Sequence, residues 1–99
     1  MYPTNRQWQL FDRYKNCPPP MPPSRFLQLW DLDYPDIARL TGVSRNTIAH
    51  WFSTGAGSRP APEQHCRRLA TIDFLWRNLD RIPWELLDEW CSLTEDTEG

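Results

Sequence analysis

The sequence predicts an all-α fold, a compact bundle of about five short helices with two tightly connected helices at its centre. Three observations support this prediction. Apolar residues recur every three or four positions in several stretches, as they do on one face of a helix. Prolines, glycines and capping residues separate those stretches. Six Trp, four Phe and three Tyr supply enough large rings to fill the core of a 99-residue domain.

The composition and the spacing of the cysteines argue against several classes of protein. Mean hydropathy is −0.70 and no long uncharged apolar run exists, which argues against a membrane span. Met1–Arg6 lacks the apolar segment of a signal peptide. The three cysteines are odd in number and far apart, and neither they nor the histidines have zinc-ligand spacing. We therefore expect free thiols in a reducing cytoplasm, with no metal and no cofactor.

Charge is unevenly distributed along the chain, although the net charge is only −2. Residues 36–68 hold five arginines against two carboxylates, a local charge of +3. Residues 83–99 hold six carboxylates and no base, a local charge of −6. This polarity would orient the domain on a phosphate backbone with its acidic end turned away.

Residues 1–23 are predicted to form an N-terminal arm and a Pro-rich linker. Aromatic residues three apart predict a short amphipathic helix over Asn5–Tyr14. We expect this helix to cover the core; the alternative is an arm that uses Arg6, Arg13 and Lys15 to touch DNA or a partner. Five prolines in residues 17–23 predict a stiff polyproline II spacer, which we prefer to a ligand for a Pro-binding domain.

The domain proper is predicted over residues 24–93. Ser24 is expected to cap a helix of Arg25–Leu32, which turns inward a set of apolar side chains: Phe26, Leu29, Trp30 and Leu32. Asp33 is expected to cap the next helix, Tyr34–Thr41, with Pro35 in its first turn. That helix should bury Ile37, Ala38 and Leu40.

A second short helix is predicted directly after Tyr34–Thr41. Gly42 is expected to end the preceding helix in a left-handed conformation, and Val43 places an apolar side chain in the turn. Ser44 is expected to cap a helix that ends near Thr54. Ile48 and Trp51 should point inward, joined by Phe52 on the same side. The opposite face would then carry Ala49 together with six polar side chains, namely Ser44, Arg45, Asn46, Thr47, His50 and Ser53.

The longest helix is predicted over residues 62–79, with Pro62 in its first turn. Its apolar stripe consists of Cys66, Leu69, Ile72, Trp76 and Leu79. Arg67 and Arg68 should face solvent or phosphate. A last helix, Trp84–Leu93, carries Trp84, Leu87, Trp90 and Cys91; we expect it to close the core, the alternative being a dimer or partner surface. Residues 94–99 form an acidic tail expected to be mobile.

The spacing of Ala38, Gly42, Val43, Ile48 and Trp51 resembles the helix-turn-helix of the phage repressor and Cro class. The segments 55–60 and 62–70 resemble the loop and helix that follow it in that family, so the resemblance covers residues 25–90. Where the family often has a phosphate-anchoring glutamine, this chain has Tyr34-Pro35-Asp36. MerR-type regulators carry a similar pair of helices, but the β wing that follows it there is not evident in residues 55–62.

The resemblance implies a lambda-repressor-like fold and a transcriptional regulator that binds double-stranded DNA sequence-specifically. It also implies a homodimer or a larger protein partner, and a bacterial or phage-encoded protein of the cytoplasm, associated with the nucleoid. The helix of residues 44–54 would enter the major groove, where Arg45 can read guanine and Asn46 adenine at about 1–3 kcal/mol each. Ser44 would bond a phosphate, Thr47 would meet a thymine methyl or a phosphate, and His50 would be a further base reader.

Ser58 and Arg59, in the following loop, would hold the DNA backbone without reading sequence. The competing hypothesis is a protein-protein interaction module that keeps the same scaffold without binding DNA. The low net charge, the acidic end, the many aromatic residues and the Pro-rich segment motivate it. An enzyme is the least favoured class, because the sequence has no nucleophile arrangement, no Gly-rich phosphate loop and no metal spacing.

Overall fold

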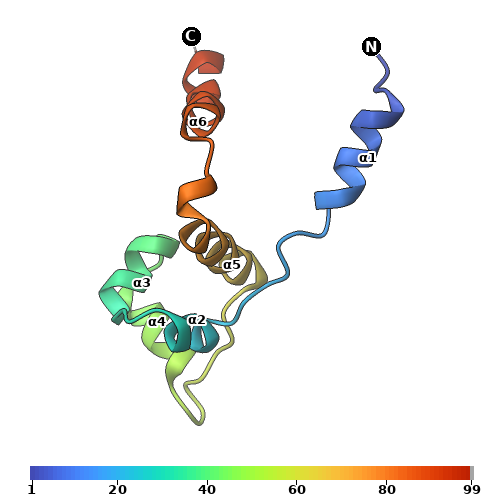
Figure 1. The fold of residues 1–99 in the computed structure, drawn as a ribbon. Helices are drawn as coiled ribbons and strands as arrows, with labels where there is room; N and C mark the ends of the chain where they lie inside the picture. Colours follow the sequence, from blue (N-terminus) through green and yellow to red (C-terminus); the bar gives the residue numbers. More distant parts are fainter. Residues whose placement is uncertain (99) are drawn as a thin grey trace.

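The computed structural model describes the backbone of residues 1–98 and the side chains of residues 1–92. This part of the chain holds six α-helices, one short 3-10 helix and no strand, which confirms the all-α prediction (Figure 1). The elements follow one another as α1 Asn5–Tyr14, α2 Pro23–Leu29, α3 Tyr34–Thr41, α4 Arg45–Phe52, α5 Glu63–Arg77, η1 Leu79–Arg81 and α6 Trp84–Glu98.

The core lies where α2, α3, α4 and α5 meet. Each of these four helices contributes one fully buried apolar side chain, namely Phe26, Ile37, Ile48 and Leu69. Burying such a side chain stabilises a fold by about 1.5–3 kcal/mol. The fully buried centre is therefore small, and partly buried hydrophobic side chains of the surrounding helices and turns pack against it.

The boundaries of α3 and α4 follow the predicted capping residues. Asp33 accepts a hydrogen bond from the backbone N–H of Asp36, whose carboxylate accepts one from the N–H of Asp33. Gly42 then ends α3 at φ +74°, a left-handed conformation that L side chains rarely adopt. The Ser44 hydroxyl accepts the N–H of Thr47 and starts α4. α4 ends at Phe52, two residues before the predicted Thr54.

α2 differs from its prediction at both ends. It begins at Pro23, because proline at the first helical position has a suitable φ and loses no hydrogen bond, so Ser24 lies inside the helix and does not cap it. It ends at Leu29, which is exposed. The ring of Trp30, just after the helix, packs edge-on against Trp76 with centroids 4.9 Å apart.

The Pro-rich linker lies along α5. The backbone N–H of Met21 donates to the carbonyl of Cys66 at 3.0 Å, and the Arg67 guanidinium donates to the carbonyl of Pro18 at 2.9 Å. Arg67 also pairs with Glu63 at 2.9 Å. The linker is thus fixed to the domain at two points.

α5 is shorter than predicted, and its inner face is less apolar than the predicted stripe. Pro62 precedes the helix as its N-cap, and Leu79 falls in η1 and is exposed. Cys66 and Leu69 are buried as expected, whereas Trp76 is exposed at the edge of the core. A carboxylate, Asp73, is buried on the same side of the helix.

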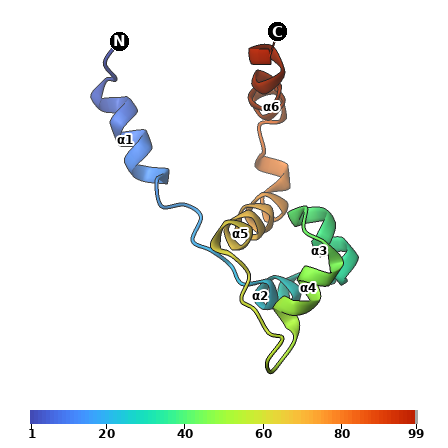
Figure 2. The ribbon, with the colours of Figure 1, turned by 180° about the vertical axis from the view of Figure 1, so that it is seen from behind.

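α1 and α6 project from the same side of the core and do not cover it (Figures 1 and 2). No residue of α1 is buried, so the expectation of a covering helix is wrong. The same holds for α6, whose Trp84 and Trp90 are exposed. The Cα radius of gyration is 16.9 Å, against about 13 Å for a compact domain of 100 residues. Only α2–α5 form a compact bundle.

α6 also continues beyond the predicted end at Leu93 as far as Glu98. The acidic tail predicted over residues 94–99 therefore begins inside this helix, while the side chains of residues 93–98 and all of Gly99 lie outside the described part of the chain. Within that part, none of the helices combines the length and the apolar character needed to cross a membrane.

Candidate nucleic-acid interface

α4 presents a polar face to solvent because its other face is held against the core. Ile48 is fully buried, and Trp51 and Phe52 are half-buried beside it. The ring of Phe52 also stacks on Tyr34 of α3, with centroids 5.0 Å apart, which links the end of α4 to the start of α3. Six predicted site residues are exposed on the outer face: Ser44, Arg45, Asn46, Thr47, Ala49 and His50.

In the first turn of α4, some polar side chains are hydrogen-bonded within the molecule and others are not. The hydroxyls of Ser44 and Thr47 lie 3.0 Å apart and are joined by a hydrogen bond at the helix cap. The side chains of Arg45 and Asn46 make no hydrogen bond and no ion pair with the described part of the chain. These two side chains are therefore available to an external partner without breaking an internal contact.

The loop after α4 folds back on the end of that helix. The His50 ring nitrogen Nδ1 lies 3.0 Å from the carbonyl of Gly57, and the backbone N–H of Arg59 donates to the carbonyl of His50 at 3.1 Å. Ser53 is half-buried, and its hydroxyl donates to the same carbonyl. His50, which we predicted on the open polar face, thus also holds the loop in place, and Ser53 bonds back to the last turn of α4.

Arg59 and Ser58 are exposed and lie on this loop, beyond the end of α4. The loop forms the end of the molecule opposite to the free ends of α1 and α6 (Figures 1 and 2). A shallow hollow of about 250 Å³ separates α4 from the loop and is lined by Val43, Thr47, His50, Trp51, Arg59, Pro60, Pro62 and His65. Of the predicted site residues, the structure brings Thr47, His50 and Arg59 together around this hollow, whereas Arg45, Asn46 and Ser58 do not line it.

Two arginines of the basic segment are used inside the molecule. Besides Arg67, which holds the linker, Arg68 donates through Nε to the carbonyl of Leu40 at 2.7 Å, in the last turn of α3. A cation there satisfies a carbonyl that the helix leaves unpaired and complements the helix dipole. On the α3–α4 side, the exposed arginines whose side chains make no hydrogen bond or ion pair within the described part of the chain are thus Arg39, Arg45 and Arg59.

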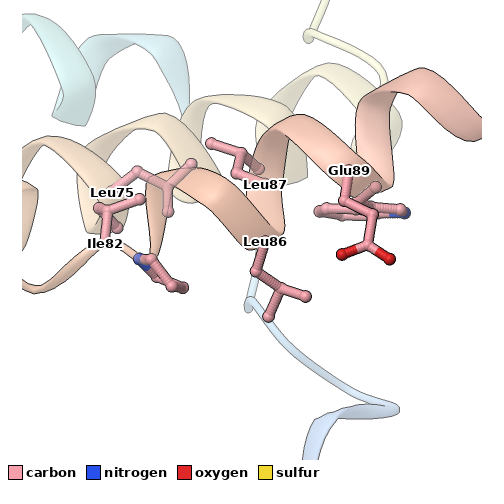
Figure 3. Close-up of a pocket in the computed structure, with 7 residues that line it drawn as sticks. Leu75, Ile82, Leu86, Leu87 and Glu89 are labelled. Atoms are coloured by element: carbon pink, nitrogen blue, oxygen red, sulfur yellow. The ribbon is translucent and has the colours of Figure 1, made fainter.

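A second candidate surface lies at the junction of α5 and α6. An open apolar groove of about 510 Å³ is lined by Leu75, Ile82, Pro83, Leu86, Leu87, Glu89 and Trp90 (Figure 3). It contains Leu87 and Trp90 from the predicted partner surface but not Trp84. Leu86 was not among the residues predicted for this surface. It is exposed and lies four residues before Trp90, a spacing that places both on one face of a helix.

In the described part of the chain, no cluster of three or more His, Cys, Asp or Glu residues is arranged to hold a metal ion. Comparison with protein-family models, with curated proteins and with solved structures finds no match to this chain.

Proposed function

We propose that the chain is a sequence-specific double-stranded DNA-binding transcriptional regulator that reads the major groove with α4. The proposal rests on one observation above all: the side chains of Arg45 and Asn46 are exposed and make no hydrogen bond or ion pair with the described part of the chain. They lie in the first turn of a helix whose other face is anchored by Ile48. In this proposal α3, the turn at Gly42 and α4 act as a helix-turn-helix in a lambda-repressor-like domain.

The dimensions and chemistry of α4 suit this role. A helix fits the major groove of B-DNA, and in helix-turn-helix proteins the first turns of the second helix contact the base edges. Arg45 supplies the two parallel donors that guanine accepts at O6 and N7. Asn46 supplies the donor and the acceptor that adenine requires at N7 and N6. Thr47 offers a methyl group to thymine, since its hydroxyl is already bonded at the cap.

The loop of Ser58 and Arg59 would contact the phosphate backbone. Its geometry is already fixed by the hydrogen bonds from His50 and to the His50 carbonyl, so little ordering is needed on binding. Contacts of this kind set the position of the recognition helix but do not distinguish sequences. The acidic α6 lies at the other end of the molecule, where it would not repel the DNA.

The first experiment is the selection of binding sites from a random duplex library, followed by fluorescence anisotropy on the selected site and on random DNA. Arg45→Ala should weaken binding to the selected site by about 1–3 kcal/mol and change little on random DNA. Arg59→Ala is the matched control, because it should weaken both complexes equally. An equal loss on both duplexes for Arg45→Ala would contradict its role as a base reader.

Salt dependence provides a further check on the same complexes. The logarithm of the binding constant should fall with the logarithm of salt concentration with a slope of about −0.9 per neutralised phosphate. Arg59→Ala should reduce that slope by about one phosphate.

A second candidate function is a protein-protein interaction module on the same scaffold. The exposed aromatic side chains of α1 and α6 favour it, because soluble monomers rarely expose large contiguous apolar patches. Absence of duplex binding even at low salt, together with a tight protein partner, would support this function in place of the first.

A further inference from the structure

The loop that follows α4 closes on the ring of His50. A turn in this loop is closed by the backbone N–H of Ser58, which donates to the carbonyl of Gly55 at 3.1 Å. Gly55 has φ +91°, a conformation that L side chains rarely adopt. The carbonyl of Gly57, inside the turn, lies 3.0 Å from Nδ1 of His50. A backbone atom of the loop thus holds the imidazole ring.

This contact determines which ring nitrogen of His50 carries the proton. A neutral imidazole has one N–H, which donates, and one bare nitrogen, which accepts. A carbonyl oxygen accepts and cannot donate, so the proton belongs on Nδ1 and the lone pair on Nε2. Nε2 makes no hydrogen bond within the described part of the chain, and the residue is exposed. His50 therefore offers an acceptor to a molecule outside the chain.

His50 lies on the outer face of α4. Four exposed or half-buried residues spaced by three and four positions share this face, away from the buried Ile48: Asn46, Ala49, His50 and Ser53. At about 1.5 Å per residue, Asn46 and His50 are about 6 Å apart along the helix axis, close to two base steps of about 3.4 Å. The two side chains would therefore reach neighbouring bases of one groove.

A side chain that accepts at its free end complements the other polar side chains of α4. Arg45 can only donate, and Asn46 both donates and accepts. Residues 44–54 contain no Asp or Glu, the side chains that usually accept from the amino group of cytosine. In the major groove, cytosine and adenine present an amino group, whereas guanine and thymine present acceptors. Nε2 of His50 would bond the first pair of bases and be repelled by the second.

We propose that His50 recognises the amino group of cytosine or adenine in the major groove through Nε2, with the carbonyl of Gly57 holding the ring as an acceptor. This inference rests on the DNA-binding function proposed above and names the class of base that this part of α4 reads. The loop then orients a base-reading side chain, in addition to the phosphate contacts of Ser58 and Arg59. Because the ring is held before DNA arrives, less conformational entropy is lost on binding.

Site selection from one random duplex library with three proteins tests the base preference. The parent, His50→Asn and His65→Gln are compared at about pH 8, where an imidazole is neutral. The Asn amide can donate to Gly57 in place of Nδ1 but has no atom at the position of Nε2. The parent should prefer cytosine or adenine at one position by at least about fivefold, the value of one hydrogen bond. His50→Asn should reduce that preference below about twofold and keep the others.

His65→Gln is the matched control for this selection. The ring of His65 packs on Trp51, with centroids 5.5 Å apart, and it extends from α5 rather than from the outer face of α4. This variant should select the same sites as the parent. A change in the same base preference for both histidine variants would overturn the assignment to His50.

The position of the proton on His50 is measured without DNA. Long-range ¹H–¹⁵N correlation spectra distinguish a protonated ring nitrogen from a bare one. The chain has two histidines, so His65→Gln leaves His50 as the only imidazole in the spectrum. At about pH 8 the proton should be on Nδ1. A proton on Nε2 would overturn the proposal whatever sites are selected.

The remaining outcomes separate this inference from the proposed function. The reading by His50 is wrong if His50→Asn changes no preference, removes a preference for guanine or thymine, or weakens all positions alike. The first two of these results leave DNA binding by α4 standing, and the third would mean that the ring only holds the loop. A parent protein that selects no duplex contradicts the proposed function itself, and this inference falls with it.

Discussion

At the scale of single residues, Asp73 illustrates what apolar spacing does not reveal. It is buried on the inner side of α5, where its carboxylate Oδ1 accepts the indole N–H of Trp30 and the Nε–H of Arg77, both at 3.0 Å. This acceptor holds Trp30 in its contact with Trp76. A buried polar atom of this kind is stable because its hydrogen bonds are made.

Asp73→Ala should lower the free energy of unfolding by about 1–3 kcal/mol, because it leaves the Trp30 N–H without an acceptor. Asp73→Asn retains an acceptor oxygen and should lose less than half as much. Urea unfolding followed by tryptophan fluorescence measures both values. Equal losses in the two variants would show that the carboxylate charge, and not the hydrogen bond to Trp30, stabilises this corner.

Cys66 provides a pH-dependent prediction. Burial, reinforced by the nearby Glu63 carboxylate, raises the pKa of its thiol above the ordinary value of 9.0. Because the folded-state pKa exceeds the unfolded one, the corresponding stability is fully present below pH 9.0 and is lost as pH rises through the folded-state pKa.

Cys66→Ala should remove that part of the loss of stability above pH 9.0, as measured by urea unfolding across this range. An identical pH profile of stability in the parent and the variant would contradict the assignment.

The burial of Cys66 also predicts its reactivity. In the parent protein, an alkylating reagent at neutral pH should modify the exposed Cys17 and Cys91 well before Cys66.

At the scale of elements, capping residues locate helix ends better than apolar spacing does. The predicted bounds of α3 are those observed, because Asp33, Pro35 and Gly42 each act through local backbone chemistry. α5 was predicted too long at its C-terminal end, where the sequence has no glycine to mark a stop. Asn78 is its C-cap, and the side-chain amide of Asn78 donates to the carbonyl of Phe74 before the 3-10 turn. α2 was misplaced because Pro23 competes with Ser24 for the start of the helix.

Gly42→Ala should destabilise the domain by about 1–2 kcal/mol, since alanine must adopt the left-handed conformation while its Cβ meets no other atom. Gly42→Asn should cost less, because asparagine tolerates this conformation. Gly57→Ala serves as the control: its φ is not positive and its Cβ would make only an ordinary contact with His50. Thermal melting by circular dichroism ranks the three variants. A loss for Gly57→Ala as large as that for Gly42→Ala would refute the backbone argument.

At the scale of the whole molecule, the packed unit of α2–α5 is distinct from the two helices that project from it. α2–α5 enclose the four fully buried side chains, whereas α1 contributes none. The extents of 52 × 30 × 29 Å reflect these projections. α4 and its loop lie at one end of the molecule, and α1 and α6 project at the other.

Deletion of residues 1–16 should therefore leave the stability of the packed unit within about 0.5 kcal/mol of the parent value. Urea unfolding of the parent and the shortened chain measures the difference. A large loss of stability would mean that α1 packs on the core in solution.

The sequence by itself determined the helical class, the bounds of α3, the turn at Gly42 and the exposed polar set from Ser44 to His50. These depend on local backbone chemistry and on the period of apolar residues, which act within a few positions of the chain. Only the tertiary structure decided that α1 and α6 leave the core, that Asp73 is buried, and that Arg67 and Arg68 bond carbonyls far away in the sequence. An amphipathic pattern shows that a helix has a face to bury, but not which surface, or which molecule, will cover it.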